Sequence, residues 1–75
     1  MKVGDAVVFV DPRGNEHPAI LTAVWGPPES NPSVNLVFVS TDETKHDTYG
    51  RQIERETSVV HESNQYAHGM YWKTA

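Results

Sequence analysis

Cysteine is absent from the 75-residue chain, which excludes a disulfide framework and a zinc–cysteine site. Basic residues are also few: 6 Lys and Arg stand against 10 Asp and Glu, for a formal net charge of −4. This balance disfavours coating of DNA or RNA, because such binding depends on Lys and Arg meeting phosphates. The longest apolar run, residues 6–10, is far shorter than the about 20 residues that span a bilayer. We therefore expect neither a nucleic-acid nor a membrane partner.

The chain is rich in valine, whereas leucine and isoleucine are scarce. Valine is joined by 2 Phe, 2 Trp and 3 Tyr, and these β-branched and aromatic side chains pack well on a pleated sheet. The 5 Gly and 5 Pro recur at short intervals, as turns do. A chain of this length forms one domain, residues 1–75, with a small core. Because neither disulfide nor metal supports that core, we expect a homo-oligomer.

The apolar and turn patterns predict five short strands. The predicted strands are residues 6–10, 17–25, 34–40, at least 56–60, and 70–73. Between them we expect a turn at 11–15, a proline-rich loop at 26–33, and polar surface loops at 41–50 and 61–69, the former mobile. This spacing predicts an all-β fold, a small five-stranded and partly open barrel of the Src-homology-3-like type.

Two local features leave alternatives open. Residues 51–56 read either as the start of the fourth strand or as a helical turn and a half, with Arg51 and Arg55 one i,i+4 step apart. Strand 34–40 is apolar on both faces, which indicates a central strand or a face turned to a partner subunit. Pro18 removes a ladder donor, so we expect that end of the second strand at a sheet edge.

The histidines offer a weak case for a metal. His61, Glu62 and His68 could supply three ligands, but their spacing matches no tight metal-binding pair. The other interpretations are exposed loop histidines, or His61 or His68 bonding to an anionic ligand or acting on it as acid or base. Ser58 precedes His61 without a nucleophile motif, and every glycine is isolated, as in turns rather than in phosphate loops. We predict no metal and no cofactor.

Aromatic residues gather near the last strand. Tyr66, Tyr71 and Trp72 lie within seven residues, and Trp25 ends the second strand. Aromatic faces at the rim of a small barrel stack on flat ligands such as nucleobases. Tyr71 and Trp72 face opposite sides of a strand, so one belongs to the core and the other to solvent, a ligand or a subunit.

Arg51 and Arg55 are the basic pair beside the fourth strand. Arginine binds phosphate through a planar pair of donors. Because Glu54 and Glu56 flank Arg55, the alternative is a solvated stretch in which the charges neutralise one another. If either arginine shares a pocket with Tyr71 or Trp72, the site suits a small phosphorylated nucleotide rather than a long polyanion.

Several segments resemble a group of short tailed-phage and prophage proteins. The resemblance rests on residues 17–20, 24–25, 34–38, 57–59 and 71–72, and covers about two-thirds of the chain. It includes a Pro-Ala-Ile strand, a Val-Asn-Leu strand and a terminal Trp-containing strand, whereas loop 41–50 departs from the group. The resemblance implies a phage protein in the host bacterial cytoplasm. Independently, the first residues lack a signal-peptide layout, so we expect no export. Some phage proteins of this kind oligomerise and trap cyclic or ADP-ribose-type nucleotide signals.

The leading functional hypothesis is therefore a non-enzymatic protein that sequesters a nucleotide. An aromatic ring would stack on the base, an arginine would hold phosphate, and a histidine would bond phosphate or ribose. One alternative is a protein-interaction or virion-accessory module, and another is a small phosphodiesterase that uses His61 and His68. The candidate ligand-binding residues are Trp25, Arg51, Arg55, His61, Tyr66, His68, Tyr71 and Trp72.

Overall fold

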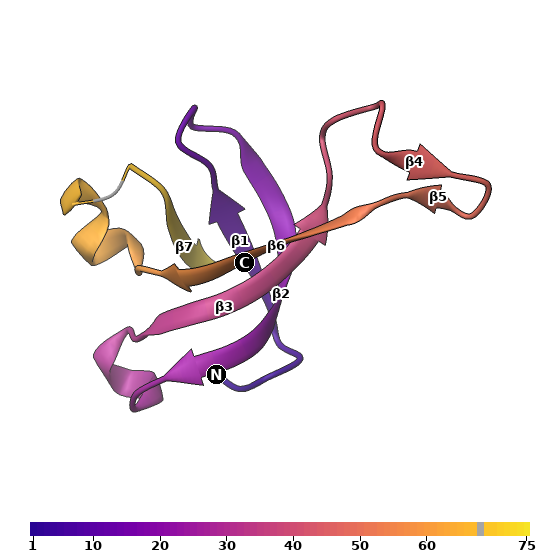
Figure 1. The fold of residues 1–75 in the computed structure, drawn as a ribbon. Coiled ribbons are helices and arrows are strands. Elements are labelled where there is room, and N and C mark those ends of the chain that lie inside the picture. Colours follow the sequence, from indigo (N-terminus) through magenta and orange to yellow (C-terminus); the bar gives the residue numbers. More distant parts are fainter. Residues whose placement is uncertain (68) are drawn as a thin grey trace.

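The computed structural model describes residues 1–67 and 69–75 and is an all-β domain (Figure 1). Its main sheet is antiparallel and five-stranded, with the order β6-β3-β2-β1-β7. The predicted small, partly open barrel is confirmed. The strands are β1 (Ala6–Val10), β2 (Glu16–Trp25), β3 (Ser33–Val39), β6 (Ile53–Val59) and β7 (Tyr71–Thr74).

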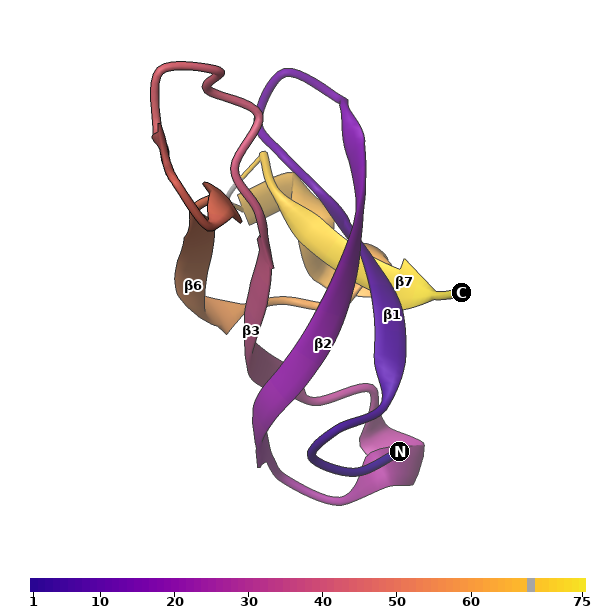
Figure 2. The same ribbon diagram turned by 90° about the vertical axis from the view of Figure 1, so that its right-hand side faces the viewer.

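The sheet curls so that its two outer strands approach each other at one point (Figure 2). The backbone N–H of Trp72 in β7 donates to the carbonyl of Val60, just beyond β6, at 2.9 Å. An isolated parallel bridge joins His61 and Trp72 at the same place. No strand pairing between β6 and β7 follows from it in the described residues, so the barrel stays open along most of that seam.

Residues 51–56 form no helical turn. Arg51 ends a short strand, β5 (Gly50–Arg51), and β6 begins at Ile53 and pairs with β3 from Val39↔Ile53 onward. As expected, Pro18 lies at an end of β2 that is paired on one side only. Pro18 lies in the central strand β2 opposite Val8 of β1, and the β2–β3 ladder begins one residue later, at Ala19. Its missing donor is tolerated because it falls where that ladder ends.

The polar segment expected to be a surface loop forms a projection that contains a hairpin, the arm (residues 41–52). It carries a two-stranded hairpin of β4 (His46–Asp47) and β5 (Gly50–Arg51). Two aspartates hold its turns, because Asp42 Oδ1 accepts from Thr44 N at 2.9 Å and Asp47 Oδ1 from Tyr49 N at 2.8 Å. Such aspartate turns stabilise a polar segment that has no apolar pattern.

Two 3₁₀ segments complete the chain. The segment η1 (Pro28–Ser30) lies in the proline-rich loop between β2 and β3, and η2 (Glu62–Ala67) lies in the loop predicted at 61–69. Both lie outside the sheet, near its ends (Figure 1).

The core fills the concave side of the sheet. Trp72 is 0 % exposed and its indole Nε1–H donates to the carbonyl of Pro32 at 2.9 Å, across forty residues of sequence. Valine, leucine and phenylalanine from the other strands surround it, because alternate residues of each strand point inward. The buried cluster comprises Val7, Phe9, Ala19, Leu21, Val34, Leu36, Val59 and Trp72.

Replacing Trp72 by phenylalanine should lower the free energy of unfolding by about 3 kcal/mol, because it leaves a cavity and an unpaired Pro32 carbonyl. Urea unfolding followed by far-UV circular dichroism measures the loss. Trp25→Phe is the matched control: Trp25 is 58 % exposed, and its loss should stay below about 1 kcal/mol. Equal losses for the two variants would contradict the central role of Trp72.

Candidate binding surface

The convex face of the sheet, which points away from the core, is also apolar. Ala6, Ile20 and Val37 stand side by side across β1, β2 and β3. The next row contains Val39 opposite Ile53. Because alternate side chains point to opposite faces, these residues lie opposite the buried cluster. Exposed fractions of 43 % for Ile20, 59 % for Val39 and 68 % for Ile53 show that nothing within the chain covers them.

These side chains line an apolar groove, called here the outer groove, with a volume of about 310 Å³. None of its lining residues is charged or carries a polar side-chain group. Small-molecule and peptide sites begin at about this size. Contiguous exposed apolar surface on a small protein marks a place of contact. The groove is lined by Ala6, Pro18, Ala19, Ile20, Val37, Phe38, Val39 and Ile53.

The neighbouring part of the same face is covered by the chain itself. Val10 is only 3 % exposed although it is not part of the core cluster. Its pairing partners are Glu16 on β2 and Tyr71 on β7, and Lys73 Nζ lies 2.7 Å from Glu16 Oε2 above it. That hydrogen bond raises the pKa of Lys73. The outer groove is thus the part of the face that remains open.

Two of the candidate residues share this convex face. Trp25 Nε1 donates to Asn35 Oδ1 at 3.0 Å, and the same oxygen accepts from Ser58 N at 2.9 Å. Ser58 has a φ of 55°, at an irregularity in the β3–β6 pairing. Asn35 therefore fixes the edge of an indole ring that is otherwise 58 % exposed. Arg55 is exposed on β6 opposite Val37, on the same face.

Arg51 and His61 lie elsewhere, at the base of the arm and beside the core. Arg51 Nη1 donates to the carbonyl of Ser40 at 2.9 Å and so fixes the base of the arm. The His61 ring packs edge-on against Trp72, with ring centroids 4.6 Å apart, and its Nδ1 lies 3.0 Å from Ser63 Oγ.

Of the two aromatic residues of β7, Tyr71 and Trp72, it is Trp72 that belongs to the core. Its assignment to a ligand site is therefore corrected, because a ring that is 0 % exposed has no face to offer. Tyr71 is half-buried. The Tyr66 side chain and His68 lie outside the described residues. Within the described part of the chain, His, Cys, Asp and Glu form no group of three or more that could hold a metal ion.

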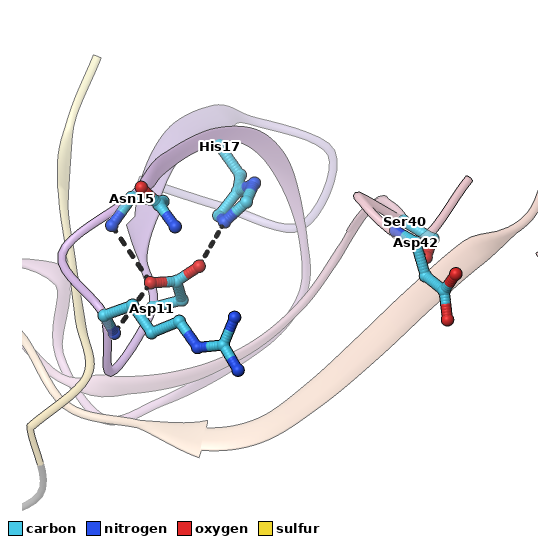
Figure 3. Close-up of polar contacts among 6 residues, drawn as sticks. Asp11, Asn15, His17, Ser40 and Asp42 are labelled. Atoms are coloured by element: carbon cyan, nitrogen blue, oxygen red, sulfur yellow. Dashed lines mark hydrogen bonds and ion pairs between the residues drawn. The ribbon is translucent and has the colours of Figure 1, made fainter. Parts of the chain in front are cut away.

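A histidine–aspartate pair that the sequence analysis did not anticipate joins the β1–β2 turn to the core (Figure 3). His17 Nε2 donates to Asp11 Oδ2 at 2.8 Å, and Asp11 Oδ1 accepts from Arg13 N at 2.9 Å and Asn15 N at 3.0 Å. His17 is 6 % exposed. The signal was present in the sequence, since a turn aspartate precedes a histidine on the following strand.

The imidazole of His17 packs against the rings of Phe9 and Phe38, which also contact each other at a centroid distance of 4.9 Å. The imidazole centroid lies 5.8 Å from that of Phe9 and 5.1 Å from that of Phe38. The hydrogen bond from His17, followed by the turn backbone, lowers the pKa of Asp11 to about 2. In the described residues, no serine or threonine hydroxyl bonds to His17. The pair thus stabilises the turn: backbone N–H groups of the turn and the imidazole of His17 together orient the carboxylate of Asp11.

The chain matches no family model, no curated protein and no solved structure. Among the described residues, the helices are too short and too polar for any of them to traverse a lipid bilayer.

The pKa of Asp11 predicts an acid-sensitive step in stability. Because the folded pKa of about 2 lies below the ordinary 3.8, the ionised carboxylate stabilises the fold above about pH 4, and this contribution is lost as the pH falls towards 2. In Asp11→Asn, the urea midpoint should depend less on pH across that window. Glu29→Gln, at an exposed carboxylate in η1, should keep the wild-type slope. An unchanged slope in Asp11→Asn would refute this assignment.

Proposed function

We propose that the protein is a non-enzymatic interaction module that binds a protein surface through the outer groove. The carrying observation is the groove itself, an apolar depression on the face that the fold does not need for its core. Its lining offers no acid, base or nucleophile. What it offers is burial of apolar area. Covering a side chain such as Ile20, Val39 or Ile53 stabilises a complex by about 1.5–3 kcal/mol for each residue.

The surroundings of the groove favour a protein partner over a small polar one. The groove crosses neighbouring strands of the sheet, so its shape is fixed by the backbone ladders of β2, β3 and β6. Polar groups stand only at its margin, where Arg55 follows Val37 along a row of the sheet. An apolar centre with a charged rim is the usual arrangement of protein–protein contacts.

Val39→Glu should abolish binding of the partner, because it places a charge in the groove at a site where the folded chain tolerates one: Val39 is 59 % exposed. Native mass spectrometry of protein taken directly from cells reports every retained polypeptide, including further copies of this chain. Thr22→Glu is the matched control, since Thr22 is exposed on β2 but does not line the groove. A wild-type protein that is monomeric and free of any polypeptide at micromolar concentration would end the proposal.

A second candidate is sequestration of a nucleotide, which the shared face of Trp25 and Arg55 favours. The indole is held at its edge by Asn35 and is open to stacking, while Arg55 supplies a phosphate-binding guanidinium on the same side. This proposal keeps the cyclic-dinucleotide or ADP-ribose-type ligand, the anti-defence role and the host bacterial cytoplasm implied by the resemblance to phage proteins.

Isothermal titration against cyclic dinucleotides and cyclic ADP-ribose isomers tests the second candidate. Trp25→Ala and Arg55→Ala should each weaken binding at least about tenfold, since stacking contributes about 1–3 kcal/mol per base. Arg13→Ala, in the β1–β2 turn, should bind as the wild type does. Absence of heat with every ligand of the panel would rule out this function and leave the interaction module untouched.

A further inference from the structure

The arm presents an aromatic side chain that the rest of the molecule does not use. Tyr49, at its tip, is 96 % exposed. The backbone of the tip nevertheless forms a defined turn. Asp47 Oδ1 accepts from Tyr49 N at 2.8 Å, and Gly50 adopts a φ of 122° that completes the turn. Because the backbone is fixed in this way, ordering the phenol ring at an interface restricts only the side-chain torsions of Tyr49 and has a small entropic cost.

The root of the arm is equally well fixed. Ser40 N donates to the carbonyl of Gln52 at 2.9 Å, and Gln52 N donates to that of Lys45 at 2.9 Å. Lys45 Nζ lies 3.7 Å from Glu54 Oε1, and Arg51 bonds the Ser40 carbonyl. These bonds direct the hairpin away from the barrel (Figure 1). An isolated two-stranded hairpin is marginally stable in water, so a projecting one gains from a surface to lie on.

The outer groove ends where the arm begins. Val39 and Ile53 form the pair of the β3–β6 ladder nearest to the arm, and both line the groove. From Ile53 to Tyr49 the chain runs four residues, about 13 Å in extended form. Tyr49 therefore stands too far out to fill the groove of its own chain, as its 96 % exposure confirms.

We propose that the outer groove of one copy receives Tyr49 of a second copy, so that two chains exchange arms about a two-fold axis. When two arms lie side by side in opposite directions, each tip meets the root of the other, which is where the groove lies. Such a contact is self-complementary and closes at two copies. The inference rests on the proposed function, because it names the partner of the same groove.

The groove has the size and chemistry for this occupant. A cavity of about 150 Å³ is enough for a benzene ring, so a groove of about 310 Å³ accepts a phenol ring with adjacent tip atoms. Its lining is wholly apolar, which suits the ring faces, and it is open at the surface, which leaves the hydroxyl in water.

The charges agree with the same arrangement. Asp47 lies beside the tip and Arg55 lies beyond the root, next to Val37. In the described side chains, neither takes part in an ion pair within its own chain. With arms in opposite directions, Asp47 of one copy approaches the end of the other barrel that carries Arg55, which offsets part of the repulsion between two chains of net charge −4.

The size of the chain sets how much surface such a contact has to cover. A stable dimer buries about 800 Å² on each partner, about a sixth of the 4997 Å² of accessible surface of this chain. Two arms and two grooves come together in one interface. For a core this small without cysteine, such burial is a substantial addition to stability.

Sedimentation equilibrium of the full chain tests the contact. Tyr49→Ser should raise the dimer dissociation constant at least about tenfold, as loss of an interface anchor does, whereas Tyr49→Phe, which keeps the ring, should change it less than about threefold. Because Tyr49 is 96 % exposed, the circular dichroism of both variants should match the wild type.

Cysteine cross-linking locates the contact, since the natural chain has no thiol. Thr48→Cys protein mixed with Val39→Cys protein should give a mixed dimer with a short bis-maleimide. Thr48→Cys mixed with Thr22→Cys should not.

The outcomes separate the two proposals. If Val39→Glu breaks the assembly while Tyr49→Ser dimerises normally and the Thr48–Val39 pair fails to link, the groove binds another surface and arm exchange is wrong. If wild-type protein stays monomeric and Val39→Glu changes nothing, the interaction module fails as well.

Discussion

The buried indole of Trp72 is the constraint on which the other features depend. Its side chain donates to the Pro32 carbonyl and its backbone N–H to the Val60 carbonyl. One residue of the last strand thus ties together the lead into β3 and the end of β6, which are far apart in sequence. Because an unpaired buried acceptor costs about 1–3 kcal/mol, these bonds determine how far the sheet curls and so fix the curvature of its convex side.

That curvature divides the apolar residues between two faces with different roles. The concave face holds the core cluster. On the convex face, Lys73 and Glu16 form a bridge over the strand that carries Val10, whereas the region around Ile20 and Val39 stays open. A chain of this size has too little polar surface to cover both faces. The open region is thus expected from the composition, and it is the surface that we propose for a partner.

The sequence was sufficient for β1, β2 and β3, because their valine-containing segments lie between proline and glycine and favour a pleated sheet. Alternation predicted that Tyr71 and Trp72 would separate, but the choice of Trp72 for the core depends on its pairing with Phe9, which is non-local. The shared face of Trp25 and Arg55 depends on the irregularity between Leu21 and Ala23 in the β2–β3 ladder, and no periodicity reveals it. The arm was missed because aspartate turns, rather than apolar residues, stabilise it.

The clamped root of the arm has a consequence for how such a chain can diversify. The bonds among Ser40, Lys45, Arg51 and Gln52 close the hairpin at its base. Residues 46–50 beyond that base can therefore change without loss of these bonds. Sequence changes confined to residues 46–50 alter the shape of the tip of the arm and leave the barrel unchanged. If copies pair through the arm as proposed, differences of only a few side chains decide which copies fit one another.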